Sequence, residues 1–387
     1  MTIMRAERTE IAGERIVKIA SSFLYARRGT TVHELLAELK EPYRDAIAIV
    51  DDDAKVEGVI VPQDLVEILG KPFGRDLLQR QSVEQIMRKA DTFRYDEYIQ
   101  EVTERVRGEI GRDGECQYVL VDEAGIFRGH VSSQDILLNA MNQHARELDT
   151  ATRIQGRFVP PSLSLSSGRV SIACSAVMAQ GVGGDYYHAL EYAPGEWFFC
   201  LCDISGKGVS AAIITAVLAG FMCNANFADP VEKTVAKLNR IVLDAFKLEK
   251  YLTGFFARFS ERTGELEYCD MGHAFLYACE RGSVHRVSEE ADNVPVGLVE
   301  EPHISQRTLR LAPGTALLVL SDGIVEQENA EGVTFPVENL GPVIDAERDR
   351  VHGLVRAKIR AFETFYAFKG EVPQRDDVSM LLFRFGE

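Results

Sequence analysis

The sequence lacks a long apolar run, a signal peptide and a surplus of basic residues, and each absence excludes a class of protein. No apolar stretch among its 387 residues is long enough to cross a bilayer. The N-terminus has no basic segment followed by an apolar one. The formal net charge of −16 disfavours a broad nucleic-acid footprint. We therefore expect a cytoplasmic globular protein that binds neither membranes nor nucleic acids.

Cysteine is also scarce, and its spacing excludes the common cysteine motifs. The seven cysteines are odd in number, scattered and set in apolar segments, and no Cys-x-x-Cys pair occurs. A zinc or redox motif is therefore not expected. Reduced, buried thiols are the expected state.

The length predicts two or three domains, and the first half contains an internal repeat. The segments "AIVDDDAKVEGVIVPQDLVEIL" (48–69) and "VLVDEAGIFRGHVSSQDILLNA" (119–140) share one pattern. Each reads as an apolar strand, an acidic turn, a second strand with a glycine, and a helix. Glycine and aspartate recur 71 residues apart in the two copies. A constant offset predicts a duplicated unit.

The repeat resembles a tandem pair of CBS (cystathionine-beta-synthase-like) domains. The resemblance implies that adenine nucleotides bind in the clefts between the copies, through a glycine, a hydroxyl and an aspartate at fixed spacing. The second copy has all three, as Gly129, Ser132 and Asp135. As an alternative, Ser132 and Asp135 only cap the helix that follows.

The first copy departs from this nucleotide-binding pattern. It has the glycine and the aspartate, as Gly58 and Asp64, but Val61 stands where the hydroxyl is expected. The resemblance therefore implies a nucleotide site in the second copy and leaves the first in question.

A helix is predicted between the two halves, because residues 132–158 contain no proline and Pro160 and Pro161 follow. Its seam alternates steps of four and three residues, at Leu137, Met141, His144, Leu148, Ala151, Gln155 and Phe158. Two interpretations stay open. The helix packs on its own domain, or it forms a short parallel coiled coil that joins two protomers into a homodimer.

The second half alternates strands with two apolar helices, and aspartates lie at or near the strand ends. Carboxylates at the ends of different strands can converge on one edge of stacked sheets. No histidine or cysteine accompanies them, so the ligand set is all oxygen, which selects Mg²⁺ or Mn²⁺. Such carboxylates crowd together only when cations neutralise them. The candidate residues are Asp185, Asp203, Asp322, Asp376 and Asp377.

Six motifs in the second half carry a resemblance to a known family. "GVGGDYY", "CDISGKGVSAA", "MGHAFLY", "NVPVGL", "LLVLSDGIVE" and "RDDVSML" occur in this order. They resemble the bacterial PPM-type serine/threonine phosphatases typified by stage II sporulation protein E and RsbU. The two resemblances imply an α+β protein with an N-terminal CBS pair of α/β repeats, a linker helix and a C-terminal αββα phosphatase sandwich. The implied boundaries are 1–140 for the CBS pair (copies at about 15–72 and 80–140), 132–159 for the connecting helix, and 160–387 for the phosphatase domain.

The phosphatase resemblance also implies roles for individual residues. Two Mn²⁺ or Mg²⁺ ions would activate a water that attacks a phosphoserine or phosphothreonine. Asp203 would bridge the ions, and Asp322 and Asp376 would hold one of them. The Ile204 carbonyl would coordinate the other, and Asp185 would bind directly or through water, with Asp377 as a further ligand. The implied partner is a STAS-type anti-sigma-factor antagonist, dephosphorylated under control of the CBS module.

Four positions depart from the family pattern, namely His188, Lys207, Met271 and Phe275. Lys207 either contacts the phosphate or is a solvated turn residue, and His273 is either a proton donor or a packed strand residue. The competing hypothesis for the whole chain is a non-catalytic, nucleotide-sensing regulatory protein with a phosphatase-like domain. A second alternative keeps the enzyme but makes a small phosphate ester its substrate.

Overall fold

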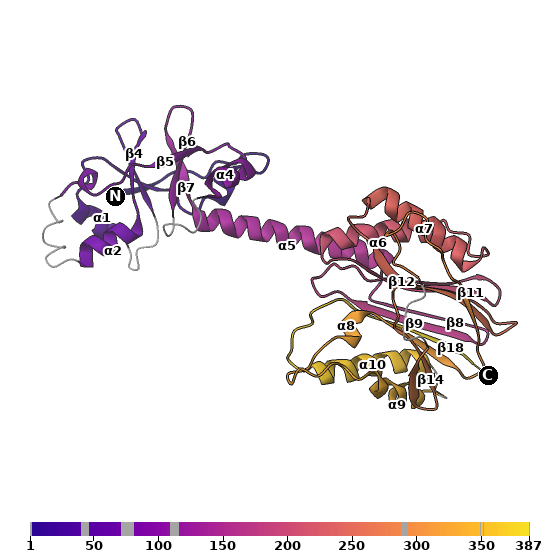
Figure 1. The fold of residues 1–387 in the computed structure, drawn as a ribbon. Helices are drawn as coiled ribbons and strands as arrows, with labels where there is room; N and C mark the ends of the chain where they lie inside the picture. Colours follow the sequence, from indigo (N-terminus) through magenta and orange to yellow (C-terminus); the bar gives the residue numbers. More distant parts are fainter. Residues whose placement is uncertain are drawn as a thin grey trace. The chain divides into compact units, whose positions relative to one another are not determined.

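The computed structural model describes residues 2–39, 46–70, 81–108, 116–287, 293–348, 350 and 352–386. The chain forms two compact units, Met1–Arg146 and Glu147–Glu387 (Figure 1). None of the helices in the described ranges combines the length and apolar character that a membrane span requires. The expected limits of the two repeat copies at 72 and 80 lie outside the described residues.

The first unit contains two small sheets, and the register of their antiparallel strand pairs repeats at 71 residues. In each sheet a parallel pair is followed by an antiparallel pair. Ile49 lies opposite Gly58 and Leu120 lies opposite Gly129, and in both sheets the register shifts at the next residue. The sheets are β1 (Ile3–Arg5), β2 (Leu24–Arg27), β3 (Ile47–Val50) and β4 (Val56–Ile60), and β5 (Asp91–Arg94), β6 (Gln117–Val121) and β7 (Phe127–Ser132). The helices are η1 (Ile16–Ile19), α1 (Val32–Glu38), α2 (Pro62–Gly70), η2 (Val83–Gln85) and α4 (Ile99–Val106).

The last strand of each repeat copy also forms a backbone bridge with the first segment of the other copy. Ser22, near the start of the first copy, forms a bridge with His130 of β7, and Arg88, near the start of the second copy, forms one with Val59 of β4. The bridges satisfy backbone groups at the sheet edges, which would otherwise need water. The two copies are therefore interleaved within one unit.

Helix α5 (Ser133–Phe158) starts directly after β7 and runs for 26 residues without a break. Its apolar residues Leu137 and Met141 are 46% and 61% exposed, which leaves the first part of the expected seam uncovered. Gln155 is only 4% exposed because it packs inside the second unit. Its assignment to a seam between protomers is therefore wrong, and the seam is limited to the earlier part of the helix.

The second unit is a sandwich of two antiparallel sheets covered by helices, as the α+β prediction requires (Figure 1). Helices α6 and α7 lie on one side of the stacked sheets, and α9 and α10 lie on the other. One sheet contains β10 (Tyr186–Ala193), β11 (Glu196–Ile204), β12 (Leu252–Ser260), β13 (Glu265–Met271) and β16 (Arg307–Arg310). The other contains β15 (Ser283–Arg286), β14 (Leu276–Glu280), β17 (Ala316–Leu320), β18 (Val378–Phe385), β9 (Val170–Val177) and β8 (Ser162–Ser167). The helices are α6 (Val209–Met222), α7 (Val231–Phe246), α8 (Asp322–Val325), η3 (Val337–Asn339), α9 (Leu340–Asp345) and α10 (Gly353–Lys369).

Aromatic side chains fill the space between the two sheets. Phe199 of β11 stacks on Phe383 of β18 with ring centroids 4.9 Å apart, and Phe259 of β12 meets the same ring edge-on. Buried aromatic pairs of this kind stabilise the stacking and fix which strand ends lie together.

The glycines of "GVGGDYY" lie in a loop ahead of a strand, because β10 begins only at Tyr186 and Gly183, Gly184 and Asp185 precede it. All seven cysteines are free, as expected, but Cys223 at the end of α6 is exposed and Cys116 is half-buried.

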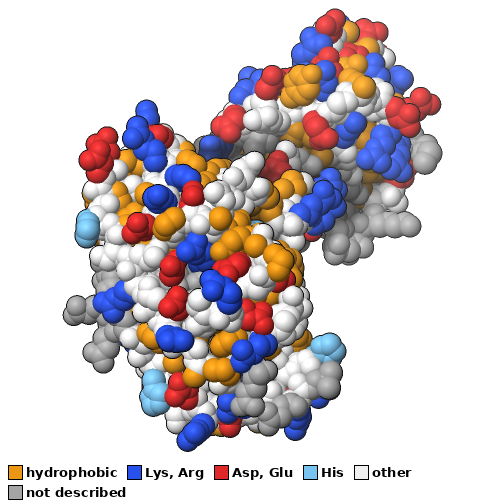
Figure 2. All heavy atoms as spheres, turned by 90° about the vertical axis from the view of Figure 1, so that its right-hand side faces the viewer, with side chains coloured by type: hydrophobic (Ala, Val, Ile, Leu, Met, Phe, Trp, Pro, Cys, Tyr) orange, Lys and Arg blue, Asp and Glu red, His pale blue; other side chains and the backbone are white. Residues whose placement is uncertain are grey.

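The surface mixes charges of both signs. On the face drawn in Figure 2, the described Lys and Arg side chains alternate with Asp and Glu side chains and with apolar ones. That face offers no broad basic area of the kind that binds nucleic acid.

Candidate active site

Four residues predicted as metal ligands line one cavity of about 260 Å³. Asp203 and Ile204 end β11, Asp322 begins α8 just after β17, and Asp376 lies two residues before β18. Strands β17 and β18 are neighbours, and β11 belongs to the facing sheet. The cavity therefore opens where strand ends of both sheets meet. Its other lining residues are Ser205, Gly206, Lys207, Tyr251, Thr253, Gly272, His273, Phe275 and Glu326.

Asp185 does not line this cavity. Its side chain is 1% exposed, and neither carboxylate oxygen has a hydrogen-bond partner among the described residues. Burial, reinforced by the nearby charges of Asp203 and Asp377, raises the pKa of Asp185 well above its usual range. A buried carboxylate without partners is costly in free energy, so Asp185 is a place where a cation would stabilise the fold.

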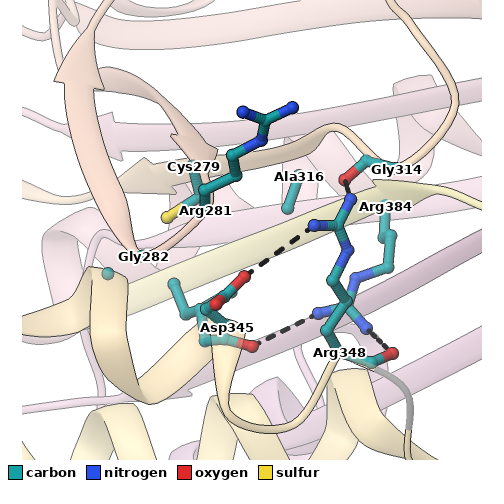
Figure 3. A pocket seen from close by; sticks show the side chains of 10 residues that line it. Cys279, Arg281, Gly282, Gly314, Ala316, Asp345, Arg348 and Arg384 are labelled. Carbon is teal, nitrogen blue, oxygen red and sulfur yellow. Dashed lines mark hydrogen bonds and ion pairs between the residues drawn. The ribbon is translucent and has the colours of Figure 1, made fainter.

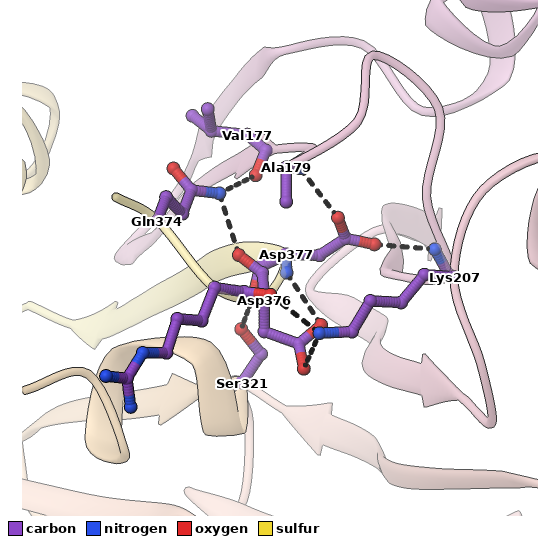
Figure 4. Close-up of polar contacts among 9 residues, drawn as sticks. Val177, Ala179, Lys207, Ser321, Gln374, Asp376 and Asp377 are labelled. Atoms are coloured by element: carbon purple, nitrogen blue, oxygen red, sulfur yellow. Dashed lines mark hydrogen bonds and ion pairs between the residues drawn. The ribbon is translucent and has the colours of Figure 1, made fainter. Parts of the chain in front are cut away.

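The Asp377 carboxylate holds the loop that carries Asp185, and Figure 4 shows its contact with Ala179. The backbone N–H groups of Ala179 and Gly184 donate to its two oxygens over 2.8 and 2.7 Å. A side chain at Gly183 would collide with this carboxylate, and one at Gly184 would come within 2.8 Å of the Ile204 carbonyl oxygen. Both positions therefore require glycine, because the loop passes so close to two candidate ligands.

The carboxylates that line the cavity repel one another. Burial, followed by the charges of Asp322 and Asp376, raises the pKa of Asp203 to about 8. Burial and the charge of Asp376 also raise the pKa of Asp322. Lys207 supplies a counter-charge, because its Nζ lies 2.8 Å from Asp376 Oδ2 and donates to the Arg375 carbonyl over 2.6 Å (Figure 4).

The residues fit a hard divalent cation by their chemistry. The lining offers carboxylates and the Ile204 carbonyl, which are ligands of Mg²⁺ and Mn²⁺. In the described part of the chain, no three His, Cys, Asp or Glu side chains are already gathered as ligands of one ion. The contacts explain this, because Asp376 is turned toward Lys207 and Asp377 toward backbone amides. Repulsion also keeps unneutralised carboxylates apart.

His273 lines the cavity as a buried, neutral side chain. It is 3% exposed, burial lowers its pKa to about 4, and its Nε2 has no partner among the described residues. Its ring meets that of Phe275 edge-on at 5.8 Å. A neutral imidazole carries a single N–H, and the ring is hydrogen-bonded to the backbone of Leu320, so burial and these contacts favour the packed-residue interpretation over the proton donor.

The other departures from the family pattern have local explanations. His188 of β10 stacks near Phe227 at 6.0 Å, and burial lowers its pKa. Met271 is fully buried at the end of β13. No sequence motif contains Tyr251 or Thr253, which reach the cavity from the start of β12, and Glu326, the last residue of "LLVLSDGIVE", reaches it from the end of α8.

In the first unit, the predicted nucleotide residues of the second copy form a compact cluster. The Ser132 N–H and hydroxyl and the Ser21 hydroxyl all donate to Asp135 Oδ2, over 2.8, 2.8 and 2.6 Å. The Asp135 N–H donates back to the Ser132 hydroxyl. This reciprocal pair of hydrogen bonds is a capping box at the start of α5. Gly129 has a positive φ of 153° and lies against Phe23.

The equivalent cluster in the first copy is different. Asp64 is 7% exposed and forms an ion pair with Arg88, and Val61 is buried beside it. A side chain at Gly58 would collide with Met87 and the Arg88 carbonyl. The aspartate of the first copy therefore already has a cationic partner, Arg88 from the start of the second copy, whereas the aspartate of the second copy is bonded by hydroxyls.

A further pocket near α9 is too small for a phosphate ester (Figure 3). Its volume is about 10 Å³, room for little more than a water molecule. Arg348 lies 3.9 Å from Asp345 and donates to the Gly314 carbonyl, and Arg384 donates to the Arg348 carbonyl. These contacts tie the strand ends to the loop after α9.

Comparison with known proteins identifies both units. Residues 193–386 match the family of stage II sporulation protein E (SpoIIE), and residues 16–71 match the CBS domain. The first match covers half of the chain, so the protein belongs to the SpoIIE family. It therefore has a PP2C-type serine/threonine phosphatase domain, a hydrolase domain, together with an N-terminal CBS domain. Members of this family bind Mn²⁺ or Mg²⁺.

Several solved structures are similar to between 56% and 64% of this chain. The PP2C domain of SiaA from Pseudomonas aeruginosa is 22% identical, with a TM-score of 0.52, over 64% of this chain and 98% of that one. The PP2C phosphatase domain and regulatory fragment of SpoIIE from Bacillus subtilis is 17% identical, with a TM-score of 0.44, over 56% and 64%. The catalytic domain of PstP, solved with two manganese ions, is 13% identical, with a TM-score of 0.41, over 56% and 99%. No curated protein matches the sequence.

Proposed function

We propose that this protein is a Mn²⁺- or Mg²⁺-dependent phosphatase that hydrolyses phosphoserine or phosphothreonine on a protein substrate. The observation that carries the proposal is the convergence of Asp203, Ile204, Asp322 and Asp376 on one cavity. The unpartnered Asp185 behind it supports the same assignment. Hard oxygen ligands gathered around an open cavity suit metal-assisted hydrolysis, which needs no cysteine or serine nucleophile.

Each residue of the site has a proposed part in this chemistry. Asp203 contributes to both cations, the Ile204 carbonyl to one, and Asp322 and Asp376 to the other. Asp185 binds directly or through water, and Asp377 positions the loop that carries Asp185, with ligation as a weaker alternative. Bound cations of this kind supply an activated water and offset the charge of the phosphoryl oxygens. Lys207, at the cavity wall, is placed to meet an anionic substrate once it leaves Asp376.

A Mn²⁺-dependent assay with p-nitrophenyl phosphate tests the activity. We expect turnover that EDTA abolishes and Mn²⁺ alone restores. A folded, uncontaminated protein without turnover in Mn²⁺ or Mg²⁺ would instead support the non-catalytic regulatory alternative. Turnover of the ester, combined with failure to hydrolyse phosphoserine or phosphothreonine on any protein substrate, would favour the small-molecule alternative.

The proposed substrate is a phosphorylated STAS-type anti-sigma-factor antagonist, by family resemblance. The Asp203→Asn protein, which should bind substrate without hydrolysing it, is the reagent for capture, followed by phosphosite mapping of what it retains. We also propose that the chain is a homodimer and that the second CBS copy binds an adenine nucleotide. The exposed Leu137 and Met141 and the Gly129, Ser132 and Asp135 cluster support these two proposals.

A further inference from the structure

The side-chain amide of Gln155 makes a closed set of hydrogen bonds at the end of α5. Its Nε2 donates to the Gly183 carbonyl over 2.8 Å, and its Oε1 accepts from the Gly183 N–H over 3.1 Å. The same Nε2 donates to Thr215 Oγ1 of α6 over 3.0 Å, and that hydroxyl donates onward to the Ala212 carbonyl. The buried Gln155 amide thus bonds both the N–H and the C=O of Gly183. It also links α5 and α6 to this glycine.

That glycine belongs to the loop on which the candidate metal site depends. Gly183 and Gly184 are followed directly by Asp185, and the Gly184 N–H donates to Asp377. The loop passes between the Asp377 carboxylate and the Ile204 carbonyl. Only glycine fits there, because a Cβ atom at either position would come too close to these oxygens. It has no regular secondary structure of its own, so its position is set by these few polar contacts.

We propose that Gln155 is a positioning residue that sets the Gly183–Asp185 loop for cation binding. This inference rests on the proposed metal site and adds a residue that none of the six motifs of the second half contains. The physical reason is direct: a side chain that bonds both the N–H and the C=O of Gly183 fixes the orientation of that peptide, and Asp185 follows two residues later. Because α5 carries Gln155 in its last turn, a rotation or shift of the helix would move the loop with it.

The test compares the full-length protein with its Gln155→Met variant, which keeps side-chain length and removes the amide. We expect faster hydrogen exchange in peptides that cover Gly183 and Gly184. By calorimetry we expect about a tenfold weaker Mn²⁺ affinity, with kcat near the wild-type value once Mn²⁺ is saturating. The matched control is Gln143→Met, the same change at an exposed position of the same helix, which should leave both readouts unchanged.

A folded Gln155→Met protein with Mn²⁺ affinity within about twofold of wild type and unchanged exchange would overturn the inference. If that variant does not fold, Thr215→Val removes one acceptor of the Gln155 amide with little change in shape. It should weaken Mn²⁺ binding about threefold, and unchanged binding would count against the proposal. Failure of the wild-type protein to bind Mn²⁺ would overturn the proposed function instead, while the exchange measurement would still report whether Gln155 holds the loop.

Discussion

The Lys207 ammonium lies 2.8 Å from a carboxylate oxygen of Asp376, one of the proposed metal ligands. The two side chains are each about 40% exposed, so the pair is accessible to solvent and easily exchanged. Lys207 thereby offsets part of the negative charge around Asp203 and Asp322. A cation that binds Asp376 has to displace this ammonium group.

Replacing Lys207 with methionine should therefore strengthen Mn²⁺ binding, by about threefold to tenfold, because a competing charge is removed. Calorimetric titration of the variant measures this directly. Lys250→Met is the matched control, since Lys250 Nζ donates to the Ser205 carbonyl in the same region but pairs with no metal-site carboxylate. A weaker Mn²⁺ affinity in Lys207→Met would show that the lysine supports the site rather than competes for it.

Asp203→Ala and Asp322→Ala should each abolish phosphatase turnover while the fold is retained. Both side chains line the cavity, and burial together with the like charges around them raises their pKa values, so their removal relieves desolvation and repulsion in the metal-free protein. Turnover in Mn²⁺ measures the loss of activity, and thermal unfolding measures the change in stability. Wild-type turnover by purified Asp322→Ala would make the site assignment wrong.

The protein should be a dimer at micromolar concentration, through the exposed part of α5. Leu137 and Met141 are apolar, solvent-exposed and one helical turn apart, which is the pattern of a helix seam. Light scattering of the wild type should give twice the monomer mass, and Leu137→Glu with Met141→Glu should give the monomer. Ile154→Glu, at another exposed site of α5, is the control. A monomeric wild-type protein would contradict the predicted dimer.

An adenine nucleotide should bind once per chain, in the second CBS copy, and change phosphatase turnover. Ser132 and Asp135 offer polar groups there, whereas Asp64 of the first copy is already paired with Arg88. Calorimetry with AMP, ADP and ATP measures binding, and Asp135→Asn should weaken it. A tenfold change in turnover needs a coupling of only ~1.4 kcal/mol.

The effect of the nucleotide on turnover is best measured by comparing the full chain with residues 147–387. That fragment retains Gln155, which a fragment beginning at 160 would lose together with its contacts to Gly183. Nucleotide binding that leaves turnover unchanged would reduce the CBS module to a structural or dimerising part. Absence of binding by all three nucleotides would contradict the proposed ligand class.

The stability of the first unit should fall as the pH drops from about 6.5 to 4, through His130. Burial lowers the pKa of His130 to about 4, so the unfolded chain takes up a proton over this range and the folded chain does not. The contribution is at most ~3 kcal/mol. Denaturant unfolding at several pH values measures it, and His130→Gln, which keeps a donor for the Leu24 carbonyl, should flatten the dependence. An unchanged slope in that variant would exclude His130 as the cause.

Much of the fold could be predicted from the sequence because the relevant signals are local. The 71-residue offset between Gly58 and Gly129 reappears as identical strand register. The helix from 132 to 158 was expected from its lack of proline, and α5 spans Ser133–Phe158. The aspartates were found because strand-end carboxylates with neighbouring glycines form short, recognisable motifs.

The residues that sequence analysis missed depend on contacts between distant segments. Gln155 fits the heptad seam of its own helix, and only tertiary packing against Gly183 and Thr215 shows its other use. The pairing of Asp64 with Arg88 likewise joins two segments that no local pattern relates. The close approach of Gly183 to Asp377 also joins segments almost two hundred residues apart, which no local pattern shows.

The distribution of thiols makes the protein suitable for selective chemical labelling. Cys174, Cys202 and Cys279 are buried, and burial raises their pKa values, that of Cys279 to about 11, so they hold little reactive thiolate near neutral pH. Cys223, exposed at the end of α6, is the accessible thiol of the second unit. A maleimide dye attached there would report on the helix that Thr215 links to Gln155, without any engineered cysteine.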